Sequence, residues 1–476
     1  MKAEMDALDK NGTWELVDLP KGKKPVGCKW VFAVKLKADG SLERYKARLV
    51  AKGYTQTHGV DYQETFAPVA KMNTVRILLS LAVNFDWELQ QYDVKNAFLH
   101  GELDEEIYMS IPPGFSGGDG CKVCRLKKAL YGLKQSPRAW FGRFAKVMLA
   151  SGYKQSQGDH TLFIKHSASG RVTVLIVYVD DIIVTGNDEK EKEALKHCLA
   201  KEFEIKDLGR LKYFLGIEVA RSKQGIFISQ QKYVTDLLKE TGMMASKPVA
   251  TPIEQNHRLS EALGDKPVDR GMYQRLVGKL IYLAHTRPDI AYSVSVISQF
   301  MHDPREVHLQ AAYRVLHYLK AHPGKGILFK KTSDVNLAVY TDADFAGSPT
   351  DRRSTTGYCT FLGGNLVSWR SKKQNVVARS SAEAEFRAMA AGVCELLWVK
   401  IILEDLKIQW TGPMKLYCDN KSAINIAHNP VQHDRTKHIE IDRHFIKEKL
   451  DSGLICTPYA PTGYQLADVL TKGLYT

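Results

Sequence analysis

The chain of 476 residues is long enough for two or three domains, and its 44% hydrophobic and 25% charged residues are typical of an ordinary globular protein. No apolar run approaches the ~20 residues that a membrane span needs, and the first residues lack a signal-peptide pattern, so we expect an intracellular protein that is neither membrane-bound nor secreted. The 67 Lys and Arg residues against 53 Asp and Glu give a formal net charge of +14, which favours a polyanionic partner such as nucleic acid.

The cysteines are spread thinly along the chain. There are eight, and only Cys121 and Cys124 are closely spaced. No second pair of cysteines or histidines completes a zinc site. We therefore expect reduced cysteines, as in an intracellular protein.

The first element pair is a basic hairpin. Residues 30–37 form a strand-like run that leads into the turn Ala38-Asp39-Gly40-Ser41, and a second strand follows. Arg44, Lys46 and Arg48 alternate on that second strand, so they project from one face. A row of cations suits a triphosphate or a template backbone. A solvated basic edge strand that prevents aggregation is the alternative.

Three acids are expected to meet on neighbouring strands. The alternation after Leu89 predicts a strand that ends near Asp93. Further on, Asp180 and Asp181 lie between two apolar runs, which places them at the tip of a β-hairpin. Adjacent carboxylates repel each other unless a cation neutralises them, and Mg²⁺ is a suitable occupant. A solvated Asp-Asp turn is the alternative. If Asp93 is a third ligand, the three acids together predict a two-metal site.

The middle of the chain is predicted to be helical. Residues 191–203 carry apolar side chains at helical spacing and form an amphipathic helix. Prolines and polar turn residues between 243 and 267 indicate a boundary. From 273 to 320 the pattern is helical again, and we expect a thumb and connection region.

The last third places four acids at the ends of predicted elements. Strands over 337–342 and 415–419 end on Asp342 and Asp419, and further strands are expected around 358–361 and 367–369. Glu385 lies in the first turns of a long helix, and Asp468 lies in a short terminal helix. Each acid alone could be a cap or a solvated side chain. Glu383 is the rival to Glu385, but its capping-box position with Ser380 makes it the weaker candidate.

Four motifs carry a family resemblance. Residues 93–99 (DVKNAFL) and 178–181 (YVDD) resemble two catalytic motifs of reverse transcriptases. Residues 48–54 (RLVAKGY) and 130–140 (LYGLKQSPRAW) are similar to copia-type LTR retrotransposons. The motif order also matches, and the chain resembles the reverse transcriptase–ribonuclease H portion of a copia-type Pol polyprotein.

The resemblance implies a fold class and three domains. The expected class is α+β multidomain: a right-hand polymerase with fingers, palm and thumb, followed by a ribonuclease H-like α/β domain. Fingers and palm are expected in 1–245, a helical thumb and connection in 246–333, and the ribonuclease H-like domain in 334–476. The chain stops soon after Asp468, where family members usually continue, so we expect the last helix to be loosely held.

The resemblance also assigns roles to residues. It implies a metal-binding role for the polymerase acids Asp93, Asp180 and Asp181 and for the nuclease acids Asp342, Glu385, Asp419 and Asp468. It implies nucleotide or template contacts for Lys46, Arg48, Phe98, Gln135, Ser136, Pro137 and Tyr178. Phe98 matches the aromatic that excludes a ribose 2′-OH, with a core aromatic as the alternative. His438 is a candidate helper for product release, although packing or backbone hydrogen bonding is the stronger alternative.

The function implied is RNA- and DNA-templated DNA synthesis with cleavage of the RNA strand of RNA–DNA hybrids. Each active site would use two Mg²⁺ ions, with Mn²⁺ as a possible substitute. The partners would be an RNA template, a DNA primer, the RNA–DNA hybrid and dNTPs, in the cytoplasm (as a virus-like particle) or the nucleus; the sequence does not indicate the oligomeric state. The alternative is a decayed or co-opted retrotransposon copy that only folds or binds nucleic acid.

Overall fold

The computed structural model describes residues 1–36, 41–115, 122–262, 264–332, 334–410, 412–429 and 439–473. They form two compact units. The first unit contains Met1–Ala70 and Glu88–Arg210, and the second contains Lys71–Trp87 and Leu211–Thr476. The three functional domains expected from the sequence stay predictions.

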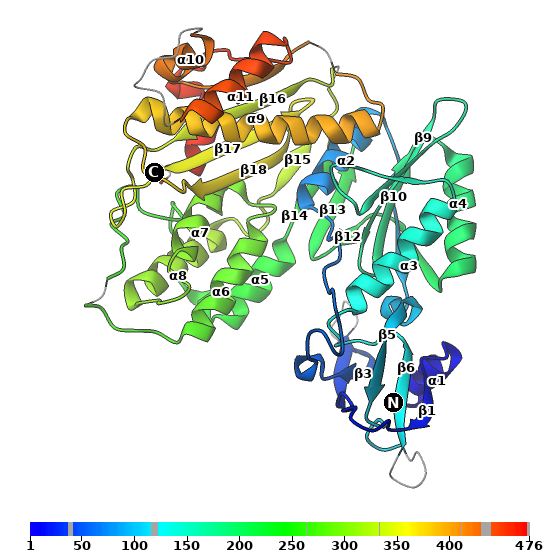
Figure 1. Ribbon diagram of the computed structural model, residues 1–476. Coiled ribbons are helices and arrows are strands. Elements are labelled where there is room, and N and C mark those ends of the chain that lie inside the picture. Colours follow the sequence, from blue (N-terminus) through cyan, green and yellow to red (C-terminus); the bar gives the residue numbers. More distant parts are fainter. Residues whose placement is uncertain are drawn as a thin grey trace. The chain divides into compact units, whose positions relative to one another are not determined.

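The first unit is built on a six-stranded sheet with the order β11-β4-β10-β9-β8-β7. Its strands are β4 (Gln90–Val94), β7 (Lys154–Gln155), β8 (Leu162–His166), β9 (Val172–Tyr178), β10 (Asp181–Gly186) and β11 (Ile205–Arg210). The central strands β9 and β10 are rich in buried Val, Ile and Leu, as expected for a sheet covered by helices. Helices α3 (Ser136–Ala150) and α4 (Glu189–Glu202) supply side chains to the same core, including Phe144 and Leu199. The hairpin predicted around the Asp180-Asp181 pair is confirmed (Figure 1).

Smaller sheets complete the first unit. A three-stranded sheet contains β1 (Trp14–Asp18), β6 (Lys122–Lys128) and β5 (Glu102–Met109). The basic hairpin is β2 (Cys28–Leu36) paired with β3 (Leu42–Ala51); its predicted turn at 38–40 lies outside the described residues. Helix α1 (Lys2–Lys10) and the 3-10 turns η1 (Gly53–Thr55) and η2 (Ala97–His100) complete this part.

The second unit contains a five-stranded mixed sheet with the order β18-β17-β16-β19-β20. Its strands are β16 (Leu337–Ala343), β17 (Thr355–Leu362), β18 (Asn365–Lys373), β19 (Met414–Tyr417) and β20 (Ile455–Cys456). In this sheet β17 pairs antiparallel with both β16 and β18, whereas β19 runs parallel to both β16 and β20. Helix α9 (Ser381–Asp405) lies along this sheet (Figure 1), and α10 (Lys421–His428), α11 (Glu440–Asp451) and the 3-10 turn η7 (Leu466–Leu470) follow. This element order confirms the expected ribonuclease H-like fold.

The rest of the second unit has a small antiparallel sheet and a helical group. The sheet order is β12-β13-β14-β15, from Tyr213–Phe214, Ile217–Ser222, Gly225–Ser229 and Ile327–Phe329. The helices are α5 (Gln231–Glu240), α6 (Arg270–Leu283), α7 (Ala291–Ser298) and α8 (Glu306–Ala321), with the short 3-10 turns η3 (Met243–Ala245) and η4 (Pro288–Ile290). Within the region 273–320 that was predicted to be helical, Leu309, Leu316 and Leu319 of α8 are buried with Val277 and Leu280 in one cluster.

One helix of the second unit comes from far earlier in the chain. Helix α2 (Met72–Asn84) is buried from Thr74 to Val83 and packs against β18. Its Ser80 hydroxyl donates to the Leu362 carbonyl at 2.9 Å. Residues 72–84 therefore belong structurally to the unit that carries the ribonuclease H-like sheet.

Candidate active sites and family membership

The first acid cluster lies where β4 and β10 run side by side. Asp181 is the direct cross-strand partner of Asp93. Opposed residues in antiparallel strands project from the same face, so their two carboxyl groups face the same space. The backbone of Asp180 is held to the same strand, because Val94 N–H donates to its carbonyl at 2.8 Å. The structure thus brings together the three acids predicted from the sequence.

The turn that carries these acids is strained. Val179 has a φ of +52°, a conformation that β-branched residues rarely adopt and that costs on the order of 1–3 kcal/mol. Trp140 on α3 is 2% exposed, and its indole Nε1 donates to the Val179 carbonyl at 2.7 Å. This contact helps to hold the turn, and so positions Asp180.

The first cluster is electrostatically unfavourable without a cation. Burial and the neighbouring Asp180 raise the pKa of Asp93. Burial raises the pKa of Asp181 to about 6, against a lowering effect of the Gln91 amide, which donates to Asp181 Oδ1 at 3.1 Å. Gln91 is buried on β4, two residues before Asp93. The three acids offer carboxylate oxygens, which suit a hard divalent cation.

A cleft of about 700 Å³ connects the acids to the basic hairpin. Asp93 and Asp180 line it together with Lys46 and Arg48 of β3. Burial and the adjacent Arg48 lower the pKa of Lys46, and the Lys46 charge offsets part of the rise in the Asp93 pKa. The structure therefore brings the two predicted cations to the acid cluster.

Aromatic side chains border the same region. The Arg48 guanidinium lies 3.7 Å from the centroid of the Tyr131 ring, and Tyr131 packs edge-on against Phe98 at 4.8 Å between centroids. Phe98 also lines an apolar pocket of about 360 Å³, with Pro137 and Tyr178 among its other walls. Three of the predicted nucleotide- or template-contacting residues thus share one pocket.

Gln135 and Ser136 are engaged inside the protein. Gln135 is 2% exposed; its amide accepts from Gln56 at 3.0 Å and donates to the Asp61 carbonyl at 2.9 Å. Ser136 is fully buried and its hydroxyl donates to the Leu130 carbonyl at 2.6 Å. Their predicted contact with template or nucleotide stays a prediction, and the observed contacts hold the loop before α3.

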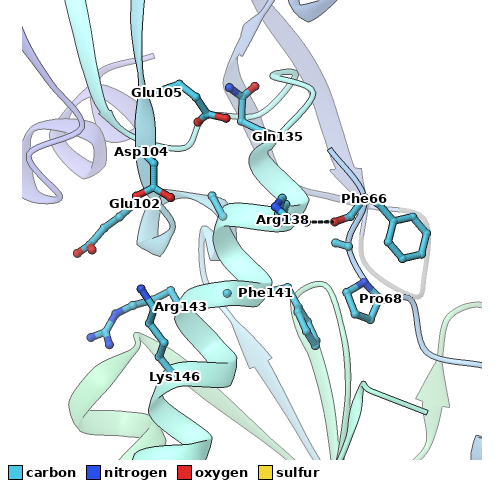
Figure 2. Close-up of a pocket in the computed structure, with 13 residues that line it drawn as sticks. Phe66, Pro68, Glu102, Asp104, Glu105, Gln135, Arg138, Phe141, Arg143 and Lys146 are labelled. Carbon is cyan, nitrogen blue, oxygen red and sulfur yellow. Dashed lines mark hydrogen bonds between the residues drawn. The ribbon is translucent and has the colours of Figure 1, made fainter. Parts of the chain in front are cut away.

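A further cavity of about 330 Å³ opens beside Gln135 (Figure 2). Strand β5 supplies its acids and α3 supplies Arg138, Arg143 and Lys146. Arg138 donates to the Phe66 carbonyl at 3.3 Å, and Arg143 pairs with Glu202 at 2.7 Å. Its mixed charges are partly neutralised within the protein, so it differs from the acid-and-cation cleft.

The second acid cluster lies in the ribonuclease H-like part. Asp342 is on β16, Glu385 is on the second turn of α9, Asp419 follows β19 and Asp468 is on η7. Ligand atoms of Asp342, Asp419 and Asp468 lie within 4.8 Å of one another, and Asp419 forms a similar group with Glu385 and Cys418. The structure thus brings together all four predicted acids.

Burial and neighbouring groups shape the electrostatics of this cluster. Burial and the Asp342 carboxylate raise the pKa of Glu385, whose Oε1 accepts from Ala343 N–H at 3.2 Å. The Cys418 thiol is fully buried, 3.9 Å from Glu385 Oε2. Thr462 donates its hydroxyl to Asp419 at 3.2 Å. A divalent cation among these oxygens would relieve the repulsion that raises the Glu385 pKa.

Glu383 is used elsewhere, as its capping position predicts. Ser380 accepts from Glu383 N–H at 3.2 Å, and the Glu383 carboxylate accepts from Arg379 N–H at 2.8 Å. It also pairs with Arg387 at 2.8 Å. The candidate helper His438 lies outside the described residues.

Several side chains that contact the acids or the Val179 turn were not found from the sequence. They are Gln91, Trp140, Cys418, Thr462, Thr471 and Lys472. Cys418 is adjacent to Asp419, and Lys472 follows Asp468 by four residues, so local spacing could have indicated both. The others reach their acids or turn only through the fold.

Comparisons with known proteins agree with the two sites. Residues 11–255 match the family described as reverse transcriptase (RNA-dependent DNA polymerase). A retrovirus-related Pol polyprotein from transposon RE1 of Arabidopsis thaliana is 47% identical over all of this chain and 32% of that relative. The corresponding polyprotein from transposon TNT 1-94 of Nicotiana tabacum is 41% identical over 99% of this chain and 36% of that relative. The chain therefore spans about a third of the length of these relatives.

The solved structures add little. LC11-RNase H1, isolated from compost, is 17% identical and covers 28% of this chain and 91% of that chain, with a TM-score of 0.23. The strand order of the five-stranded sheet, and not this match, identifies the C-terminal fold. Among the described residues, no helix is long and apolar enough to span a bilayer.

A sheet that brings three acids together, followed by a ribonuclease H-like fold, is the architecture of reverse transcriptases that carry a ribonuclease H-like domain. The chain belongs to the reverse transcriptase (RNA-dependent DNA polymerase) family, as the reverse transcriptase portion of a copia-type Pol polyprotein. The resemblance seen in the sequence motifs is thereby confirmed.

Proposed function

We propose that this chain synthesises DNA on RNA and DNA templates and cleaves the RNA strand of the resulting hybrids. The observation that carries the polymerase proposal is the cleft in which Asp93 and Asp180 lie together with Lys46 and Arg48, with Asp181 paired to Asp93 across the strands. Acids and cations in one cleft suit a reaction in which a triphosphate meets a primer end. The clustering of Asp342, Asp419 and Asp468 supports the nuclease proposal.

The metals are proposed from the donor sets. Asp93, Asp180 and Asp181 would hold two Mg²⁺ in the polymerase site, and the four nuclease acids would hold two more, with Mn²⁺ as a substitute. When bound, such ions activate an attacking oxygen and neutralise the charge on the leaving oxygen. The chain's own residues bind and orient the substrates around them.

In the polymerase site, Lys46 and Arg48 would bind the triphosphate of an incoming dNTP. Phe98 would stand against the sugar and exclude a 2′-OH, because its ring is supported by Tyr131. Tyr178 and Pro137 would shape the apolar wall beside the template base. The excess of cations over the whole chain supports binding of RNA template, DNA primer and hybrid.

Primer extension tests the polymerase proposal. The purified chain receives an RNA template, a labelled DNA primer, dNTPs and Mg²⁺, beside an Asp180→Asn/Asp181→Asn variant. We expect extension by the parent and none by the variant. A parent chain that is folded and binds the hybrid without extending the primer would contradict a polymerase and support the decayed-copy alternative.

Moving the label to the RNA strand tests the nuclease proposal. We expect cleavage by the parent and by the Asp180→Asn/Asp181→Asn variant, and loss of cleavage in an Asp342→Asn variant that still extends primers. Cleavage that persists in Asp342→Asn would show that the four-acid cluster is not its source.

A further inference from the structure

A lysine lies among the acids of the nuclease site. The Lys472 Nζ is 2.9 Å from Asp468 Oδ1 and 3.5 Å from Asp342 Oδ2. The Asp342 side chain is only 2% exposed, whereas that of Lys472 is 39% exposed. One ammonium thus contacts two of the carboxylates whose oxygens cluster with those of Asp419.

The backbone directs Lys472 to this position. Both Thr471 N–H and Lys472 N–H donate to the Asp468 carbonyl, at 3.1 and 3.0 Å. The Thr471 hydroxyl donates to the same Asp342 oxygen that Lys472 approaches, and Thr471 is 1% exposed. The turn after η7 therefore wraps around Asp342, so the lysine stem starts beside the cluster rather than reaching it from a distant surface.

We propose that Lys472 is the built-in counter-cation of the nuclease site, which holds Asp342 and Asp468 together and competes with divalent metal for their oxygens. This inference rests on the proposed nuclease function. Carboxylates that share a site repel one another, and a cation in contact with two of them lowers that repulsion. A metal that binds the same oxygens must displace the ammonium, so part of its binding free energy is offset.

Removing Lys472 should change the metal affinity in the opposite direction to removing a metal ligand. Removing the ammonium while keeping a polar side chain, as in Lys472→Gln, should tighten divalent metal binding. An ion pair of this partial exposure corresponds to a change of roughly fivefold in the metal dissociation constant. The same variant should unfold at a lower temperature in EDTA, because the acids then lack their counter-charge.

The test measures Mg²⁺ binding to the full chain by calorimetry and by the rise in unfolding temperature between EDTA and Mg²⁺. All proteins carry Asp180→Asn/Asp181→Asn, so that the polymerase site does not contribute. Lys472→Gln is compared with Lys472→Arg, which keeps the positive charge and guards against a simple folding defect. Lys400→Gln is the matched control, because Lys400 pairs with Glu404 on α9 and does not touch the cluster.

We expect tighter Mg²⁺ binding and a larger temperature rise only in Lys472→Gln. Binding that is unchanged or weaker in Lys472→Gln overturns the inference, and so does equal tightening in Lys400→Gln. If Asp342→Asn does not change the Mg²⁺ response of the Asp180→Asn/Asp181→Asn background protein, the acid cluster does not bind the metal. The proposed nuclease metal site would then be contradicted, and the inference would fail with it. The metal response of the background protein therefore separates the two failures.

Discussion

At the scale of single residues, the acids of both sites are held at a cost to the fold. Glu385 is buried and Asp181 is half-buried, each beside other carboxylates, and burial raises both pKa values. Val179 stores backbone strain in the turn beside Asp180. Such costs are typical of functional sites. A bound cation would reduce them, because it neutralises the repulsion between the carboxylates.

Glu385 gives a pH prediction. Its folded pKa lies above the ordinary value of 4.5, so the native protein keeps a proton that the unfolded chain loses. This contribution to stability is fully present below pH 4.5 and is lost as the pH rises toward the raised pKa. In EDTA, Glu385→Gln should therefore unfold less readily than the parent at pH 8, by about 1 kcal/mol or more, and the two should converge near pH 5.

The measurement is thermal and denaturant unfolding between pH 5 and 8.5, with and without Mg²⁺. Mg²⁺ should reduce or reverse the difference, because it stabilises the parent site and not the variant. Glu404→Gln, an exposed change on the same helix, is the control and should follow the parent profile. Parallel profiles for Glu385→Gln and the parent would show that Glu385 is ionised in the folded protein.

Single residues also show where sequence reasoning was sufficient. Asp93, Asp180 and Asp181 were found because each lies in a short motif next to a strand of clear pattern. Gln91 and Trp140 were missed, because a buried glutamine and tryptophan look like core residues until the fold brings them to Asp181 and Val179. Positioning residues depend on tertiary contacts, and no local pattern marks them.

At the scale of elements, helix α2 is the least expected feature. Residues 72–84 fall within the segment that matches the reverse transcriptase family, yet they pack on β18 in the second unit. Arg76 is fully buried there and donates to the Val367 and His285 carbonyls, each at 2.7 Å. Its guanidinium stacks on Trp369 at 3.9 Å, and burial lowers its pKa to about 9. The positions of the strands along the chain were predictable from alternation and turns, whereas the packing of α2 depends on the surface that it contacts.

Arg76 provides the test at this scale. Arg76→Met removes the guanidinium and leaves buried carbonyls unsatisfied, so the second unit should lose about 3 kcal/mol or more of stability. Arg76→Lys should also be strongly destabilising, because a lysine cannot reproduce the planar fork or the stacking. Differential scanning calorimetry and limited proteolysis would measure the loss.

The control for Arg76 is Lys331→Met. Lys331 pairs with Asp86 just beyond the same helix, but both side chains are more than half exposed, so its removal should change stability by less than about 1 kcal/mol. A similar small effect for Arg76→Met would show that α2 contributes little to the stability of the second unit.

At the scale of the whole molecule, the positive charge supports both proposed functions. The formal net charge of +14 was read from the sequence, and the structure places part of the cationic excess on β3 beside Asp93 and Asp180. The sequence could not show which cationic side chains are engaged in contacts within the protein. Arg76, for instance, is buried in carbonyl contacts and Arg143 pairs with Glu202, so neither adds freely to a nucleic-acid surface.

The charge leads to a prediction about binding to an RNA–DNA hybrid. Cations that neutralise phosphates release condensed counterions, so affinity should fall linearly with salt on a double-logarithmic plot. If six or more phosphates are contacted, the affinity should fall by about a thousandfold between 50 and 200 mM salt. Fluorescence anisotropy with a labelled hybrid, in EDTA to prevent cleavage, measures this slope directly.

Lys46→Gln/Arg48→Gln should reduce the slope if these side chains bind the template backbone, and should leave it unchanged if they bind only the dNTP triphosphate. If the affinity of the parent chain does not change with salt, the excess of positive charge does not contribute to nucleic-acid binding. This conclusion would hold whether or not the two candidate sites are active.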